Sequence, residues 1–186
     1  MKLALFASHN GSVLEPLLEA IKERELSLEL SLIISNNTHA AVLTKAKKYA
    51  ITHALINTKT TQNPDQKLYE LLQEHKIEII LLAGYMKKLP ALITENFFVI
   101  NSHPALLPKY GGKGMYGRFV HEAVIQNAEQ ESGVTIHCVN EEYDKGAIIL
   151  QKKLSLAEDE TVQTLEQKIK ELEKSALIEA LKLCLK

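Results

Sequence analysis

The residues best suited to chemistry in this chain are Asn101 and His103, which a single residue separates. An unperturbed imidazole titrates near neutral pH, so it can donate or accept a proton. An uncharged amide can hold an oxyanion without competing for that proton. Residues two apart on an extended segment project to the same side, so both side chains can reach one ligand. We therefore expect a site at this point of the chain.

The sequence around this pair predicts the end of a strand followed by an irregular loop. An apolar run over residues 97–100 stops at Asn101, and Pro104 biases His103 away from helical dihedral angles. Pro108 and the four glycines in residues 111–117 predict a loop whose backbone amides come near a ligand. In open α/β sheets, ligands bind beyond the carboxyl ends of strands, which is where this loop is expected.

A third candidate is Asp144, which lies in the polar stretch over residues 140–146. Its carboxylate could pair with the imidazole of His103 and raise the pKa of that ring, or hold a water for proton relay. Each residue also has a structural interpretation when taken alone, because an isolated His is usually structural and Asn and Asp commonly form turns. The tertiary structure must decide whether the three side chains meet.

Short apolar runs alternate with segments of helical periodicity along the chain. This alternation predicts an α/β fold with a doubly wound, mainly parallel sheet flanked by helices. We expect strands over residues 3–7, 28–34, 77–83, 97–100, 134–139 and 147–150, and helices over 13–24, 40–49, 64–75, 121–128 and from about 161 onward. Asn63 is the expected N-cap of the third helix. The polar turn over 140–146 predicts an antiparallel hairpin toward the C-terminal part.

The last expected helix carries a stripe of apolar residues at helical spacing. The stripe consists of Leu165, Ile169, Leu172, Ala176 and Ala180. Such a stripe predicts that one face of the helix packs against the rest of the protein.

The first turn between a strand and a helix reads Ser8-His9-Asn10-Gly11-Ser12. Backbone amides and the helix dipole at such a turn favour an anion, commonly a phosphate. The turn has one glycine and no Lys, so it is neither a dinucleotide fingerprint nor a P-loop. The alternative is an ordinary polar turn in which Ser12 is the N-cap.

Composition limits the classes of function. A chain of 186 residues with 46% hydrophobic residues fits one domain over residues 1–186. The 22 basic and 23 acidic residues leave a net charge of -1, which argues against a nucleic-acid partner. We find no secretory signal and no run that could span a bilayer, so we expect a cytoplasmic protein without a membrane partner. Cys138 and Cys184 are expected to be buried, reduced thiols.

Several motifs together resemble the glycinamide ribonucleotide formyltransferases, a branch of the folate-dependent formyltransferase superfamily. The resemblance covers nearly the whole chain. Its central motif is Asn101-Ser102-His103-Pro104-Ala105-Leu106-Leu107-Pro108, followed by a glycine-rich loop over residues 109–117. The segments Ser132-Gly133-Val134-Thr135-Ile136-His137 and Tyr143-Asp144-Lys145-Gly146 complete it.

The resemblance implies roles for the matching positions. Asn101, His103 and Asp144 would be the catalytic set. In the family, two segments hold 10-formyltetrahydrofolate, largely through backbone contacts to the pterin. The matching residues here are Met86, Lys87, Lys88 and Leu89 in the first segment, and Asn140, Glu141, Glu142, Tyr143 and Asp144 in the second, with Asn101 as a further folate-binding residue. The amine substrate would bind Gly11, Ser12 and Val13 through its phosphate, and Lys170, Glu171, Leu172 and Glu173 through its glycinamide part, with Glu173 as the partner of its amine.

The implied reaction transfers the formyl group of 10-formyltetrahydrofolate to the amine of glycinamide ribonucleotide, a step of de novo purine biosynthesis. His103 and Asn101 would stabilise the oxygen of the tetrahedral intermediate, with water near Asp144 helping the proton transfer. The resemblance implies a small-molecule folate co-substrate, no metal, and a monomer or homodimer.

The chain departs from the family pattern in the phosphate turn, where His9 replaces a glycine and Val13 replaces an asparagine. His9 is expected to restrict the backbone, and Val13 removes a polar side chain while keeping its amide. An arginine that some members carry is also missing near residues 63–65. A formyltetrahydrofolate deformylase, a formyltransferase acting on another amine and a non-catalytic folate-binding relative therefore remain alternatives.

Overall fold

The computed structural model describes residues 1–185 and divides the chain into two compact units, Met1–Ile100 and Asn101–Lys186. Strand β5 (Phe98–His103) crosses this division. We call the units the N-terminal unit and the C-terminal unit and describe each by itself. The expectation of one domain over the whole chain stays a prediction.

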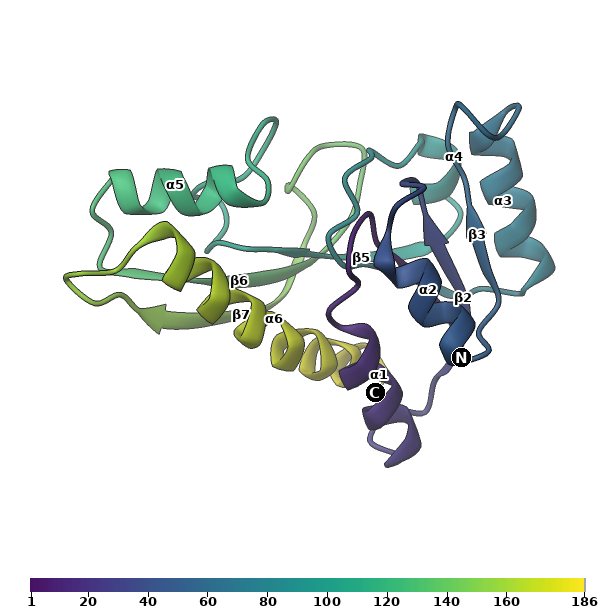
Figure 1. Ribbon diagram of the computed structural model, residues 1–186, viewed down its shortest axis with the longest axis horizontal. Coiled ribbons are helices and arrows are strands. Elements are labelled where there is room, and N and C mark those ends of the chain that lie inside the picture. Colours follow the sequence, from purple (N-terminus) through teal and green to yellow (C-terminus); the bar gives the residue numbers. More distant parts are fainter. Residues whose placement is uncertain (186) are drawn as a thin grey trace. The chain divides into compact units, whose positions relative to one another are not determined.

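The strands form a seven-stranded sheet with the order β3-β2-β1-β4-β5-β6-β7. Strand β1 pairs in parallel with β2 and β4, and β2 pairs in parallel with β3, whereas β6 and β7 are antiparallel. The fold class predicted from the sequence is therefore confirmed, including the antiparallel hairpin (Figure 1).

The N-terminal unit alternates strands and helices because buried apolar runs alternate with amphipathic segments. Its elements are β1 (Lys2–Phe6), α1 (Leu14–Lys22), β2 (Glu29–Ser35), α2 (Ala41–Lys48), β3 (His53–Leu55), α3 (Pro64–Glu74), β4 (Ile79–Leu82) and α4 (Ala91–Thr94). The sequence missed β3 and α4. Strand β3 has only three residues, all half-buried, which form no clear apolar run, and helix α4 has only four residues, too few to show helical periodicity.

The C-terminal unit contains α5 (Arg118–Gln126), β6 (Glu131–Cys138), β7 (Ile148–Ser155) and α6 (Val162–Cys184). Helix α6 contacts β6, β7 and α5. It begins after Thr161, which forms a capping box with Thr164, so the predicted start is confirmed. Its buried stripe contains four of the five expected apolar positions and also Leu177 and Leu181, while Leu172 is half-buried.

Several local expectations were wrong. Strand β5 continues through His103, so the candidate pair lies in the last residues of the strand and not after it. Val13, not Ser12, is the N-cap of α1. Asn63 is the N-cap of α3, as predicted, although its side chain makes no capping hydrogen bond. Hairpin pairing extends β7 to Ser155, because ladder hydrogen bonds continue past its apolar residues. Helix α5 begins three residues before the predicted helix, at Arg118.

Both cysteines are free, and each is half-buried rather than fully buried. No helix within residues 1–185 is both long and apolar enough to cross a membrane.

Candidate active site

His103 is held at the end of β5 by the loop that follows it. Its side chain is almost fully buried, and its Nε2 lies 2.7 Å from the carbonyl oxygen of Tyr110, to which it donates. This bond assigns the proton of a neutral ring to Nε2. Nδ1 is left facing Asp144, whose Oδ2 lies 3.6 Å away. Nδ1 is therefore the nitrogen that can exchange a proton.

Asp144 reaches this position from the turn between β6 and β7. Its Oδ2 accepts a hydrogen bond of 2.8 Å from the backbone N–H of Gly112, in the loop after β5. Asp144 and Tyr110 both have positive φ, 57° and 56°, which costs a non-glycine residue on the order of 1–2 kcal/mol. Strained backbone of this kind often lies at functional sites, and here both residues contact His103.

His137 is a member of the cluster that the sequence did not single out. Its Nδ1 lies 2.8 Å from the carbonyl oxygen of Cys138, and its Nε2 lies 3.1 Å from Nδ2 of Asn101. Nδ1 therefore donates to the carbonyl, and Nε2 accepts from the Asn101 amide. One amide hydrogen of Asn101 is used in this way, and the second has no acceptor among residues 1–185, which leaves it available to a ligand.

His137 also lies 3.6 Å from Oδ1 of Asp144, so the four side chains form one cluster within the C-terminal unit. Side chains alternate between the two faces of a strand, so Asn101 and His103, two residues apart on β5, project from the same face. A signal for His137 existed in the sequence: it lies near the end of the expected strand over residues 134–139 and ends one of the motifs that carry the family resemblance. A lone His in a strand is nevertheless indistinguishable from a core residue.

Burial dominates the electrostatics of His103. Burial lowers the pKa of its imidazole, and this effect outweighs the opposing influence of the Asp144 charge and the Tyr110 carbonyl. The expectation that Asp144 would raise the pKa of His103 is correct for the pair interaction and wrong for the net shift. Burial would raise the pKa of Asp144 itself, but its contacts with His137, His103 and the Gly112 amide bring it below the usual value.

A buried hydroxyl fixes the start of the loop after β5. Thr135 Oγ1 donates to the carbonyl of Ala105 at 2.7 Å and accepts from the N–H of Leu107 at 3.0 Å. Gln151 of β7 donates to the Leu107 carbonyl at 2.9 Å and also to Thr135 Oγ1. The hairpin therefore holds the loop that positions the Tyr110 carbonyl.

The predicted phosphate turn lies in the N-terminal unit. Gly11 has φ of +57°, and a Cβ at this position would lie 2.5 Å from Cγ2 of Val42, so only glycine fits without displacement. His9 does not adopt positive φ, so the expected restriction imposes no strain there. Val13 is buried, which leaves only its backbone for a ligand, while Ser12 is half-buried.

The other predicted binding residues lie in both units. Met86 and Lys88 are exposed after β4, Lys87 is half-buried, and Leu89 is buried. In the C-terminal unit, residues 140–143 are exposed beside Asp144. The prediction that the segments of the two units form one site stays a prediction.

On α6, Lys170 and Glu171 are exposed, and they pair with Glu166 and Lys174. Leu172 and Glu173 are half-buried. Burial raises the pKa of Glu173, and the nearby hydroxyl of Ser102 and the charge of Lys170 oppose this shift. Glu173 therefore stays protonated to higher pH than an exposed glutamate would.

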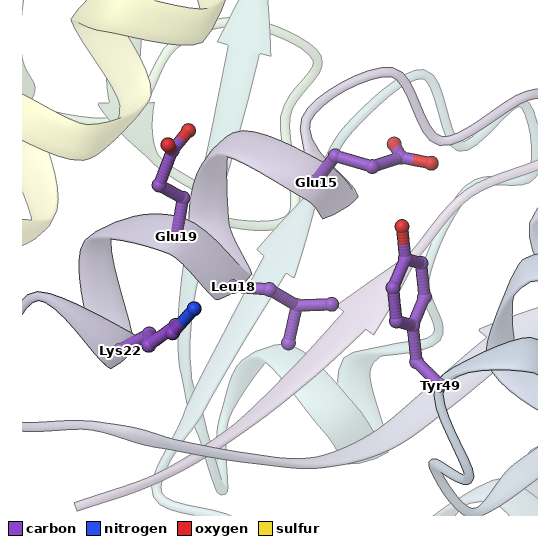
Figure 2. A pocket seen from close by; sticks show the side chains of 5 residues that line it. All are labelled: Glu15, Leu18, Glu19, Lys22 and Tyr49. Carbon is purple, nitrogen blue, oxygen red and sulfur yellow. The ribbon is translucent and has the colours of Figure 1, made fainter.

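A surface hollow of about 430 Å³ lies on the N-terminal unit. Its lining consists of Glu15, Leu18, Glu19, Lys22 and Tyr49 (Figure 2). None of the predicted site residues lines it. Within the described part of the chain, no group of three or more His, Cys, Asp or Glu side chains is placed to hold a metal ion. The expectation of a metal-free site stays a prediction.

Comparison with known proteins shows the family to which the chain belongs. The family model described as formyl transferase matches residues 1–181. The chain is 34% identical over 177 residues to phosphoribosylglycinamide formyltransferase of Haemophilus influenzae, covering 92% of this chain and 81% of the relative. It is 33% identical over 175 residues to the chloroplastic enzyme of that name from Arabidopsis thaliana, covering 90% of this chain but only 60% of the relative.

A solved structure gives the same result. The crystal structure of phosphoribosylglycinamide formyltransferase from Bacillus halodurans superimposes with a TM-score of 0.89 at 30% identity, covering all of this chain and 95% of that one.

Proposed function

The chain belongs to the formyl transferase family, and from this premise we propose that it transfers the formyl group of 10-formyltetrahydrofolate to the amine of phosphoribosylglycinamide in purine biosynthesis. One observation carries the proposal at the level of chemistry. A proton-exchanging nitrogen of His103, a carboxylate of Asp144 and a free amide hydrogen of Asn101 are held together in a largely buried cluster.

The proposed reaction uses the two substrates, these side chains and a water near Asp144 that helps the proton transfer. The substrate amine attacks the formyl carbon, and a C–N bond forms as the carbonyl π electrons move to oxygen. The Asn101 amide and a protonated His103 Nδ1 donate to this oxyanion. The tetrahedral intermediate then collapses, the bond from the formyl carbon to the folate N10 breaks, and N10 gains the proton that the amine loses.

Asp144 is proposed to stabilise the protonated state of His103. A charged imidazole is costly in a buried site, and the carboxylate at 3.6 Å offsets that cost. The Gly112 amide keeps the carboxylate oriented while the proton moves. Burial favours the neutral form of the His103 ring and the Asp144 carboxylate favours the protonated form, so the two opposing effects let the ring gain and lose a proton during the reaction.

Substrate binding is proposed at the segments that the family resemblance implies. Residues 86–89 and 140–144 would hold the pterin, residues 11–13 the phosphate, and residues 170–173 the glycinamide part. The left-handed Gly11 and its close approach to Val42 support the phosphate turn. We further propose a cytoplasmic enzyme that acts as a monomer or homodimer on small-molecule substrates.

The test is an absorbance assay of 10-formyltetrahydrofolate consumption by the purified protein, with and without phosphoribosylglycinamide. Consumption that depends on the acceptor, with formylated product identified by mass spectrometry, supports the transferase. Consumption without an acceptor would identify a deformylase, and binding of folate without turnover would identify a non-catalytic relative. Either result would contradict the proposal.

A further inference from the structure

The Ser8 hydroxyl connects two segments of the N-terminal unit that are far apart in sequence. Ser8 Oγ donates to Oδ1 of Asn36 at 2.5 Å and accepts from the backbone N–H of Met86 at 2.7 Å. The backbone of Ser8 adds two contacts: its N–H donates to the Gly84 carbonyl at 3.1 Å, and its carbonyl accepts from Asn37 Nδ2 at 2.9 Å. Ser8 thereby ties the end of β1 to the residues after β2 and β4.

Ser8 itself is sheltered from solvent, because only 2% of its surface is exposed, whereas Met86 is exposed and both hydrogen bonds of the hydroxyl are part-buried. Removing the hydroxyl takes away the partner of the Met86 N–H and of the Asn36 oxygen, so the two segments lose their common contact. The connection extends further, since the Asn36 carbonyl accepts a hydrogen bond of 3.1 Å from Asn57, which follows β3. The Val42 N–H donates to the His9 carbonyl at 3.1 Å and fixes the turn on α2.

Ser8 begins the turn that leads to Gly11, and Met86 begins the segment over residues 86–89. We infer that Ser8 is a positioning residue that aligns the anion-binding turn with the folate-binding segment, so that losing its hydroxyl weakens the binding of both substrates together. This inference rests on the proposed function. Since the Met86 N–H is already donated to Ser8, the pterin must be held by other backbone groups of the segment.

The test compares steady-state kinetics of the wild type with Ser8→Ala, Ser8→Thr and two controls. Ser8→Ala is expected to raise the KM for phosphoribosylglycinamide and the KM for the formyl donor by about tenfold each. This factor corresponds to the loss of one hydrogen bond of ordinary net strength. The kcat should change much less, because the Asn101 and His103 cluster is intact. Ser8→Thr restores an Oγ and should recover both KM values.

The controls separate alignment from general damage. Ser31 lies on β2 and its hydroxyl bonds to Glu29, only two residues away and outside the Ser8 contacts, so Ser31→Ala should leave both KM values near those of the wild type. Ser12→Ala should raise the KM for phosphoribosylglycinamide alone. If Ser8→Ala does not fold, Ser8→Cys keeps the volume with a weak donor and acceptor and takes its place.

A change in only one KM or in neither, or a lower kcat with both KM values unchanged, would overturn the inference. Calorimetric titrations with tetrahydrofolate and, separately, with inorganic phosphate repeat the comparison without turnover. If the wild type forms no formylated product, the proposed function fails, and the titrations alone decide whether Ser8→Ala weakens both ligands. A wild type that binds neither ligand would refute both statements.

Discussion

The two units hold their candidate residues in opposite ways. In the C-terminal unit, backbone groups orient the side chains: the Tyr110 carbonyl holds His103, the Cys138 carbonyl holds His137, and the Gly112 amide holds Asp144. In the N-terminal unit, side chains orient the backbone. Ser8 holds the Met86 amide there, and Asn37 holds the Ser8 carbonyl.

This difference follows from what each region is proposed to do. Proton transfer and oxyanion stabilisation require side chains fixed within a fraction of an ångström, so the backbone is their support. A phosphate or a pterin is bound by backbone N–H and C=O groups, so side chains become the support. We therefore expect substitutions in the C-terminal cluster to lower kcat, and substitutions in the N-terminal turns to change substrate binding or stability.

The largest effect is expected for His103→Ala and Asn101→Ala. Each removes a donor to the oxyanion and should lower kcat on the order of a hundredfold to a thousandfold. Steady-state turnover measures the loss, and thermal unfolding verifies that the variants are folded. His75→Ala, at the C-cap of α3, is the control and should keep normal turnover. A nearly normal kcat in both variants would show that the C-terminal cluster does not stabilise the oxyanion.

Asp144→Asn should have the next largest effect, lowering kcat by about a hundredfold. The Asp144 charge raises the pKa of His103 against burial, so its removal lets that pKa fall further. If protonated His103 is the active form, activity is lost as pH rises through its pKa. That limb of the pH profile of kcat should therefore move to lower pH in the variant. An unmoved limb would show that Asp144 does not act through His103.

Gly11→Ala tests the N-terminal turn through stability. The new Cβ would combine a positive φ with a contact of 2.5 Å to Val42, so the loss in the free energy of unfolding should be about 3 kcal/mol. Gly84→Ala is the matched control, because Gly84 also has positive φ but no atom within 4 Å of an added Cβ. It should lose only about 1 kcal/mol in urea unfolding. Equal losses would show that the Val42 contact is unimportant.

The smallest effect is expected for His121→Gln, which belongs to neither proposed set, although the charges of Glu166, Lys170 and His103 act on its ring. His121 is buried in α5, its Nδ1 has no hydrogen-bond partner among residues 1–185, and burial lowers its pKa. The unfolded chain then binds more protons than the folded one, so stability falls as pH drops below about 6.5. Urea unfolding between pH 7 and pH 5 should show a shallower decline in the variant. A parallel decline would assign the acid sensitivity to other groups.

The sequence determined the local features of this protein. Alternating apolar runs and amphipathic segments determined the order of the main strands and helices, because hydrophobic periodicity is a property of neighbouring residues. Spacing alone placed Asn101 and His103 on one face of an extended segment, and Pro104 kept His103 out of a helix. The short elements β3 and α4 were missed because they contain too few residues to show a period.

The tertiary structure decided which distant residues meet. Asp144 reaches His103 because the β6 and β7 hairpin reverses the chain at that turn, and His137 joins them through its place at the end of β6. It also decided the net pKa shift of His103, since burial depends on every element packed around the ring. Contacts and burial of this kind arise from packing between residues far apart in the chain, which no local pattern encodes.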